Sequence, residues 1–213
     1  MLKAFRVSGI IIVLALLLIT SVACKAAPTP APTPTSTSTP GVSTEWFGTD
    51  SGVNEYDGTN WTTYNTTNSG LAYDMVRTMT IDNAGNKWFG TDIGVSKYDS
   101  VNWTTYNTSN SGLARDYVAA IAIDSAGNSW FAVIEGVSKY DGANWTTYNT
   151  SNSGLASDYV YAIAIDNEGN KWFGTESGVS KYDGVNWITY DTSNSGLTND
   201  VVYAIAIDSA GNK

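Results

Sequence analysis

Tryptophan recurs through this chain at a fixed spacing of 42 residues. One series is Trp46, Trp88, Trp130 and Trp172, and the second is Trp61, Trp103, Trp145 and Trp187. A period of this length in a chain rich in Gly, Thr, Val, Tyr and Trp is typical of a β-propeller, in which each repeat forms one four-stranded blade. We therefore predict an all-β fold of four 42-residue repeats, each an antiparallel sheet.

The repeat around residues 160–192 shows how four strands fit into one period. Alternating β-branched and small residues predict an inner strand at 160–166, and further strands are predicted at 171–175, 179–182 and 187–190. Short turns containing Gly or Asn separate these strands, and the loop 191–200 leads to the next repeat. We expect the tryptophans to fill the space between blades. The alternative is that they are exposed platforms on which sugars stack.

The repeat resembles a known family. Residues 165–183, with the sequence IDNEGNKWFGTESGVSKYD, look like the two-component-regulator propeller repeat, and similar stretches occur at 81–99 and 123–141. A partial copy begins at Trp46. The resemblance implies an extracellular binding or sensing scaffold and brings no catalytic motif. In the third copy Ala132 and Val133 replace the usual Gly-Thr, so we expect a turn of different shape there.

The phase of the repeats leaves two architectures open. The first repeat begins at its second strand, residues 45–49, and a last inner strand is predicted at 201–207. These two strands could pair and close a ring of four blades, which would leave no free strand edge. The repeats could instead form an arc of a larger propeller. We favour the arc, because propellers of the resembled family usually have more blades.

The first residues have the features of an export signal. Lys3 and Arg6 precede an apolar run at 10–19, which is short for a membrane span. The following Ser-Val-Ala-Cys24 is similar to the lipobox of bacterial lipoproteins, so we predict that residues 1–23 are a cleaved signal peptide and that Cys24 is lipidated. An ordinary secretory signal and an uncleaved signal anchor are the alternatives. All three place the remainder outside the cytoplasm.

A linker is predicted between the anchor and the repeats. Residues 24–44 begin with the lipidated cysteine and contain all five prolines among small hydroxyl residues, which favours an extended chain. The repeats then occupy residues 45–213. The formal net charge is −9, and removal of the signal peptide would leave −11, which argues against nucleic acid as a partner. We expect membrane attachment through the N-terminal lipid alone.

Several kinds of catalytic chemistry are missing from the sequence. The chain has no histidine, and its single cysteine is Cys24, which removes the commonest general base and the ligands of most zinc sites. We predict a protein that is not an enzyme and that holds no cofactor or metal; a carboxylate-based glycosidase is the alternative. The Asp-x-x-Gly-Asn turns at 82–86, 124–128, 166–170 and 208–212 are expected to cap hairpins, because they lack the distal Glu of a calcium loop.

Differences between near-identical repeats mark a candidate ligand site. Residues 102–114 and 144–156 are identical, yet the positions that follow each crossover loop vary. Each repeat keeps one aspartate there, and aromatic residues beside such an acidic ring would suit a sugar or a cation. Alternatively, each aspartate caps its own crossover loop. The candidate residues are Asp74, Arg77, Asp116, Tyr117, Asp158, Tyr161, Asp200 and Tyr203.

Together these features predict a non-catalytic lipoprotein outside the cytoplasm whose β-propeller binds a glycan or a surface protein. One alternative is the sensor domain of a two-component hybrid receptor that continues beyond Lys213. The other alternative is a structural or adhesive array of repeats that has no discrete ligand.

Overall fold

The computed structural model describes residues 6–7, 10–11 and 44–208, and its contacts divide the chain into two units, Met1–Pro40 and Gly41–Lys213. In the first unit, β1 (Arg6–Val7) pairs antiparallel with β2 (Ile10–Ile11). The predicted lipidation site Cys24 and most of the predicted linker lie outside the described residues. Within the described part of the chain, no helix is long and apolar enough to cross a membrane.

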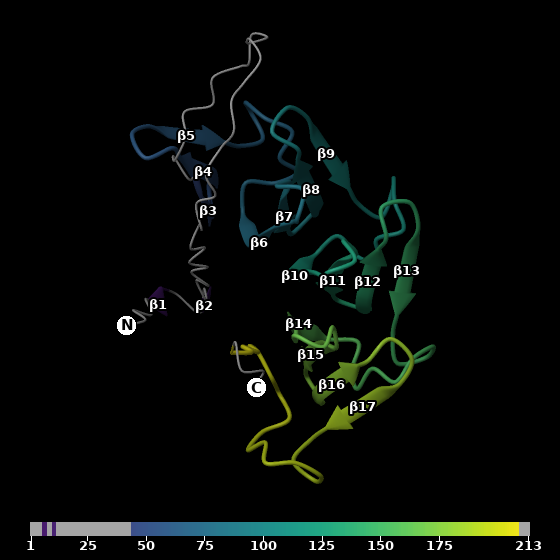
Figure 1. Ribbon diagram of the computed structural model, residues 1–213. Helices are drawn as coiled ribbons and strands as arrows, with labels where there is room; N and C mark the ends of the chain where they lie inside the picture. The colour runs from purple at the N-terminus through teal and green to yellow at the C-terminus, as the bar shows by residue number, and fades with distance from the viewer. Residues whose placement is uncertain (1–5, 8–9, 12–43, 209–213) are drawn as a thin grey trace, which may run out of the picture. The chain divides into compact units, whose positions relative to one another are not determined.

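The second unit consists of consecutive antiparallel sheets whose strands follow one another in chain order (Figure 1). The first sheet contains β3 (Glu45–Thr49), β4 (Gly52–Tyr56) and β5 (Trp61–Tyr64). The second contains β6 (Val76–Ile81), β7 (Lys87–Thr91), β8 (Gly94–Tyr98) and β9 (Trp103–Tyr106). The third contains β10 (Val118–Ile123), β11 (Ser129–Val133), β12 (Gly136–Tyr140) and β13 (Trp145–Tyr148). The fourth contains β14 (Val160–Ile165), β15 (Lys171–Thr175), β16 (Gly178–Tyr182) and β17 (Trp187–Tyr190). The predicted four-stranded antiparallel repeat is confirmed.

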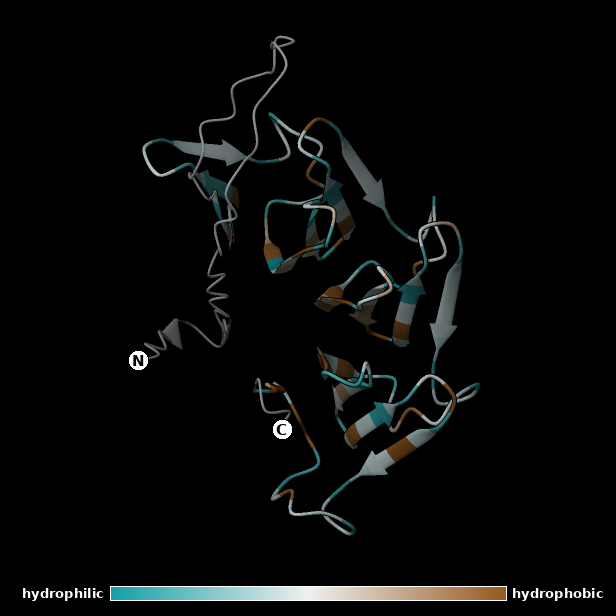
Figure 2. Ribbon diagram, in the orientation of Figure 1, coloured by the Kyte–Doolittle hydropathy of each residue, from teal (hydrophilic) through white to brown (hydrophobic). Residues whose placement is uncertain are grey.

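Neighbouring sheets pack through their inner strands. Strand β10 contacts both β6 of the preceding sheet and β14 of the following sheet. Figure 2 shows hydrophobic colour on β10 and β14, whereas the outer strands β9 and β13 are pale. On β10, Ile121 joins the core cluster that contains Trp88 of the second sheet, and Ala120 packs against the cluster that contains Phe173 of the fourth sheet. The inner strand therefore contributes to the core on both of its faces.

Aromatic side chains fill the space between the sheets. Trp130 is 1% exposed; its ring stacks on Tyr148 of the same sheet, with centroids 5.7 Å apart, and lies 6.1 Å from Phe173 of the next sheet. Trp88 is buried in the same way, between Tyr106 of its own sheet and Phe131 of the next, and Trp172 is buried with its ring stacked on Tyr190. The predicted packing of the first tryptophan series between sheets is confirmed for Trp88 and Trp130.

The second tryptophan series packs against the preceding sheet where one is present. The ring of Trp103 stacks on Phe89 of its own sheet, with centroids 5.6 Å apart, and lies 5.6 Å from Tyr64 of the first sheet. Trp61 belongs to the first sheet and has no described sheet before it, and 60% of this residue is exposed. Burial of the second series therefore depends on the neighbouring sheet.

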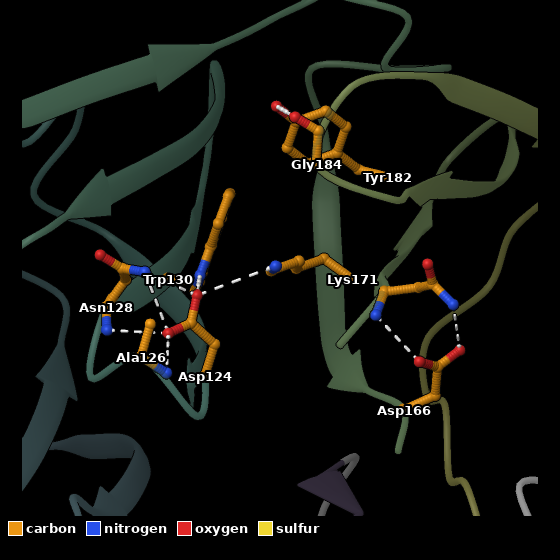
Figure 3. Close-up of polar contacts among 9 residues, drawn as sticks. Asp124, Ala126, Asn128, Trp130, Asp166, Lys171, Tyr182 and Gly184 are labelled. Carbon is orange, nitrogen blue, oxygen red and sulfur yellow. Dashed lines mark hydrogen bonds and ion pairs between the residues drawn. The ribbon is translucent and has the colours of Figure 1, made fainter. Parts of the chain in front are cut away.

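An aspartate fixes the turn that follows each inner strand. Asp124 Oδ1 accepts hydrogen bonds from the backbone N–H groups of Ala126 and Asn128 at 3.0 and 2.9 Å (Figure 3). Its Oδ2 accepts from Asn128 Nδ2 at 2.8 Å and from Trp130 Nε1 at 3.0 Å. Burial would raise the pKa of Asp124, but these hydrogen bonds outweigh it and hold the pKa below its usual range. The same network forms at Asp82 and Asp166, so the predicted hairpin capping is confirmed at these three turns.

The crossover loops into the second, third and fourth sheets each dock on the sheet that they enter. In the loop before β10, the backbone N–H of Ala114 donates to the buried Ser138 Oγ at 3.0 Å. In the loop before β14, the backbone of Gly154 approaches β17 so closely that an added Cβ would lie 2.3 Å from the Cβ of Trp187. The loop therefore needs glycine at this position, because any side chain would clash with the tryptophan.

The turn after β11 differs from its counterparts, as predicted from Ala-Val in the third copy. In the second sheet, Thr91 Oγ1 donates to the carbonyl of Gly94 at 2.9 Å. Valine replaces this threonine in the third sheet and cannot make the bond. There, Ile134 forms an isolated β-bridge with Tyr159 of the fourth sheet, and Glu135 adopts a φ of 89°. The substitution therefore changes both the local backbone and its contact with the neighbouring sheet.

The strand predicted at 201–207 is not formed in the described structure. Residues 201–208 are irregular, and they form no ladder with β3. The backbone N–H of Val202 donates instead to the carbonyl of Thr175 at 2.9 Å, which places this segment beside β15. A strand requires a ladder partner, and none is present for this segment among the described residues. Closure of the ring through pairing with β3 is therefore not observed there.

Candidate functional site

Two kinds of loop lie at the same end of each sheet. In the third sheet, Val118 at the start of β10 pairs with Val133 at the end of β11, so the crossover loop enters beside the β11–β12 turn. The turn that holds Asp124 lies at the opposite end, because β10 and β11 are antiparallel. We call the first end the entry face. It comprises residues 49–52, 73–77, 91–94, 115–119, 133–136, 157–161, 175–178 and 199–203.

The four candidate aspartates of the entry face bond to their own crossover loops. Asp116 Oδ1 accepts from the backbone N–H of Thr108 at 2.7 Å, and its Oδ2 accepts from the Thr108 hydroxyl at 3.2 Å. Asp74, Asp158 and Asp200 accept from the backbone N–H of Thr66, Thr150 and Thr192, each at 2.7 Å. The contacts support loop capping for all four. A ligand-binding ring of these carboxylates stays a prediction.

Arg77 joins a carboxylate and an aromatic ring at the entry face. Its Nε lies 2.7 Å from Asp92 Oδ1 and its Nη2 lies 3.0 Å from Asp92 Oδ2. The guanidinium carbon also lies 5.5 Å from the ring centroid of Tyr117 in the third sheet. The hydrogen bond to Asp92 raises the pKa of Arg77 above its ordinary value. The guanidinium is therefore held between an acid of its own sheet and a tyrosine of the next.

An open pocket of about 390 Å³ lies on the entry face of the third sheet. Arg115 and Glu135 form an ion pair at this pocket, and their side chains are 55% and 52% exposed. The pocket is lined by Thr108, Arg115, Asp116, Tyr117, Ile134 and Glu135. The structure therefore brings two of the predicted site residues, Asp116 and Tyr117, into one pocket.

Tyrosines gather at the entry face of the fourth sheet. The ring centroids of Tyr161 and Tyr203 are 5.1 Å apart with an interplanar angle of 43°. Tyr159 is 50% exposed and Tyr203 is 70% exposed, and the carbonyl of Tyr159 accepts from the backbone N–H of Glu176 at 3.1 Å. Burial raises the pKa of the Tyr161 phenol, and the nearby Glu176 carboxylate raises it further. Two further predicted residues, Tyr161 and Tyr203, are thus in contact.

Sequence reasoning missed the turn residues that complete these clusters. Asp92 pairs with Arg77, Ile134 lines the pocket of the third sheet, and Glu176 approaches Tyr161. The three turn residues occupy equivalent positions between the second and third strands of their sheets. The sequence does contain a signal for them, because the turns read Asp-Ile, Ile-Glu and Glu-Ser in successive repeats that are otherwise nearly identical.

The entry face is rich in acidic and aromatic groups. Its exposed large apolar residues are Tyr73, Ile93, Ile134, Tyr159 and Tyr203. Carboxylates beside tyrosine rings can bind polar neutral groups through hydrogen bonds and stacking, and cations through charge and ring contacts. In the residues that the structure describes, no group of three or more Asp, Glu, His or Cys side chains could hold a metal ion.

Comparison with known proteins supports the propeller architecture. Residues 154–177 match the family model described as two component regulator propeller. The extracellular domain of a hybrid two-component system from B. thetaiotaomicron shares 27% identity with a TM-score of 0.69, covering 78% of this chain and 24% of that chain. No match was found among curated proteins.

Two more distant structures share the fold. PorZ, a bacterial surface component of the type-IX secretion system of Porphyromonas gingivalis, is 17% identical with a TM-score of 0.56, covering 78% of this chain and 28% of that chain. A streptogramin B lyase is 14% identical with a TM-score of 0.56, covering 70% of this chain and 51% of that chain.

The matches agree with the repeat observed in the sequence and in the structure. The family model covers the second half of the crossover loop into the fourth sheet, β14, the turn that holds Asp166 and β15. The chain spans about a quarter of the length of the hybrid two-component system domain. The chain is thus an all-β protein of propeller repeats, similar to the extracellular domain of a hybrid two-component system and carrying a segment that matches the two-component regulator propeller model.

Proposed function

We propose that this protein is a non-catalytic binding module that works outside the cytoplasm, and that its entry face binds the ligand. The observation that carries the proposal is a contrast between the two ends of the sheets. At one end, the turns around Asp82, Asp124 and Asp166 repeat the same hydrogen bonds to asparagine and tryptophan. At the entry face, the equivalent residues Arg77, Ala119 and Tyr161 differ in charge, size and shape. Repeated hydrogen bonds are what a structural scaffold needs. Side chains that differ from sheet to sheet are what recognition of an asymmetric ligand needs.

The chemistry of this face favours a polar ligand. Exposed tyrosines such as Tyr73 and Tyr159 offer rings on which a sugar or an extended side chain can stack. The neighbouring carboxylates can accept hydrogen bonds from sugar hydroxyls or pair with basic groups of a protein. A glycan and a surface protein are therefore the ligand classes that we propose.

The proposed location has two independent supports. The N-terminal residues resemble a lipoprotein signal that ends at Cys24, and the repeats are similar to an extracellular domain of another bacterial protein. We propose that a lipid on Cys24 holds the propeller at the membrane. Growth of the expressing bacterium with labelled palmitate tests this: the label should appear on the wild-type chain and be absent from Cys24→Ala. Equal labelling of both chains would contradict lipidation at Cys24.

The similarity to the extracellular domain of a hybrid two-component system favours a second candidate function. In that case the propeller is the sensor part of a receptor, and its entry face binds the signal. The two candidates share the binding face. They differ in whether ligand binding changes the activity of an attached signalling domain.

A binding screen with face-specific variants tests the proposal. The purified chain is applied to glycan and peptide arrays, and the hits are re-measured with Asp116→Ala and Tyr161→Ala. Glu168→Ala is the matched control, because it removes an exposed side chain from the turn at the opposite end of the fourth sheet. We expect both entry-face variants to weaken binding while the control retains it. Unchanged binding by both entry-face variants, with folding verified by circular dichroism, would refute the proposal.

A further inference from the structure

The second sheet contains its own example of a cation held at the entry face. Both carboxylate oxygens of Asp92 contact the guanidinium of Arg77, at 2.7 and 3.0 Å. The same guanidinium lies 5.5 Å from the ring centroid of Tyr117. A guanidinium group pairs its positive charge with a carboxylate and stacks its planar face on an aromatic ring such as that of tyrosine. The fold therefore accepts a cation at this position.

The fourth sheet keeps the acid of this arrangement and lacks the cation. Two periods after Arg77 and Asp92 stand Tyr161 and Glu176. Glu176 is exposed, and none of the ion pairs found among the described residues involves it. The third sheet is different again, because Ala119 and Ile134 remove the cation and the acid together. The fourth sheet alone of these three has the carboxylate without an internal guanidinium.

Tyrosine rings lie beside this carboxylate. Residue 201, which corresponds to Tyr117, is a valine, so the aromatic surface comes from other residues. Tyr161 and Tyr203 lie with centroids 5.1 Å apart, and 70% of Tyr203 is exposed. The backbone N–H of Glu176 donates to the carbonyl of Tyr159 at 3.1 Å, which holds Glu176 against the segment that carries Tyr161. Charge and ring surface are thus both accessible from solvent.

We propose that Glu176, Tyr161 and Tyr203 form a subsite for a guanidinium or ammonium group, such as an arginine or lysine side chain of a bound peptide. The incoming cation would have Glu176 as its charged partner and the tyrosine rings as its stacking surface, the same two kinds of partner that Arg77 has in the second sheet. This inference rests on the proposed function, because it names the ligand chemistry of one part of the entry face.

A charge comparison tests the subsite directly. The full chain is titrated by NMR with N-acetyl-arginine methylamide and with the citrulline analogue, which has the same shape and no charge. Because one exposed ion pair contributes at most about 1 kcal/mol, we expect the arginine compound to bind up to about fivefold more tightly than the citrulline compound. Glu176→Gln should abolish this preference. Glu168→Gln removes one negative charge at the opposite end of the same sheet and should leave the preference unchanged.

Two further variants exchange the arrangements of the second and fourth sheets. Tyr161→Arg supplies an internal guanidinium for Glu176 and should eliminate binding of the arginine compound. Arg77→Ala vacates the position between Asp92 and Tyr117, so the number of arginine molecules bound should rise from one to two. Thermal melting of each variant verifies that the chain is folded.

The outcomes separate this inference from the proposed function. Equal binding of the arginine and citrulline compounds, or undiminished binding by Glu176→Gln, would overturn the cation subsite. If array ligands still bind in a manner that depends on Asp116, the proposed function stands without this subsite. If array ligands bind independently of Asp116 and Tyr161, the proposed function fails, and the charge preference of the small compounds still decides the subsite.

Discussion

Replacement of Asp124 by asparagine should destabilise the protein through one buried hydrogen bond. Asp124 is 6% exposed, and its Oδ2 accepts from both Trp130 Nε1 and Asn128 Nδ2. Asparagine offers one carbonyl oxygen and one NH₂ group. If the asparagine oxygen accepts from the backbone N–H groups as Oδ1 does now, the asparagine NH₂ group faces two other donors, Asn128 Nδ2 and Trp130 Nε1. The indole N–H of Trp130 then stays buried without an acceptor.

The expected magnitude follows from the groups involved. A buried donor left without a partner costs about 1–3 kcal/mol, and hydrogen bonds to a charged group contribute about 1.5–3 kcal/mol. Because these contributions overlap at one site, we expect a loss of about 2–4 kcal/mol in the free energy of unfolding. The ion pair of Asp124 with Lys171 Nζ, at 3.8 Å, is lost as well (Figure 3). Its removal should weaken contact between the third and fourth sheets.

Urea unfolding followed by tryptophan fluorescence measures this loss. The matched control is Asp141→Asn, since Asp141 also caps a turn, accepting from the backbone N–H groups of Ala143 and Asn144 at 2.9 and 2.7 Å. Its Oδ2 accepts from Asn144 Nδ2 at 3.3 Å, and because the residue is exposed, water can satisfy the groups that face an asparagine there. We expect a much smaller loss for Asp141→Asn. Equal losses for the two variants would refute the argument that the buried indole bond determines the cost.

Four other predictions follow from the same contacts. Hydrogen bonds outweigh burial and lower the pKa values of Asp82, Asp124 and Asp166 below 3.8, so these groups stabilise the fold above about pH 4. Unfolding midpoints should therefore fall as the pH drops below 4, and less steeply in Asp124→Asn. Gly154→Ala should cost about 1–3 kcal/mol in a urea titration, because its Cβ would lie 2.3 Å from the Cβ of Trp187. Gly196→Ala, whose Cβ would meet nothing within 4 Å, should be neutral; equal losses would contradict this reasoning. Ser138→Ala should cost about 1–3 kcal/mol by leaving the backbone N–H of Ala114 without its acceptor, and an unchanged midpoint would exclude this role.

The repeated strands could be predicted because their signals are local and occur several times. Alternation of Ala and Ile predicts β14, and the sequence Lys-Trp-Phe-Gly-Thr predicts β15, whose observed bounds are Lys171–Thr175. The irregular conformation of residues 201–208 could not be predicted in this way, because their sequence nearly repeats that of β14. The two segments differ in their ladder partner, because β14 pairs with β15 of the same hairpin and no described strand forms a ladder with residues 201–208.

The candidate site could be predicted in part. Tyr161 and Tyr203 occupy equivalent positions in consecutive repeats, and their rings are in contact in the structure. The contact of Arg77 with Asp92 and Tyr117 depends on how a turn of one sheet meets the entry of the next. Such contacts arise from packing between sheets and have no signature in the spacing of residues. The capping of each crossover loop by its aspartate likewise depends on the loop conformation.

Hydrogen-exchange mass spectrometry with a ligand from the array screen tests the central claim most directly, because it reports which end of the sheets is covered. Binding at the entry face should slow amide exchange at 115–119, 133–136, 157–161 and 175–178. The opposite turns at 82–86, 124–128 and 166–170 should exchange as they do in the free chain. Protection confined to those opposite turns or to the outer strands β9, β13 and β17 would contradict the assignment of the binding site to the entry face.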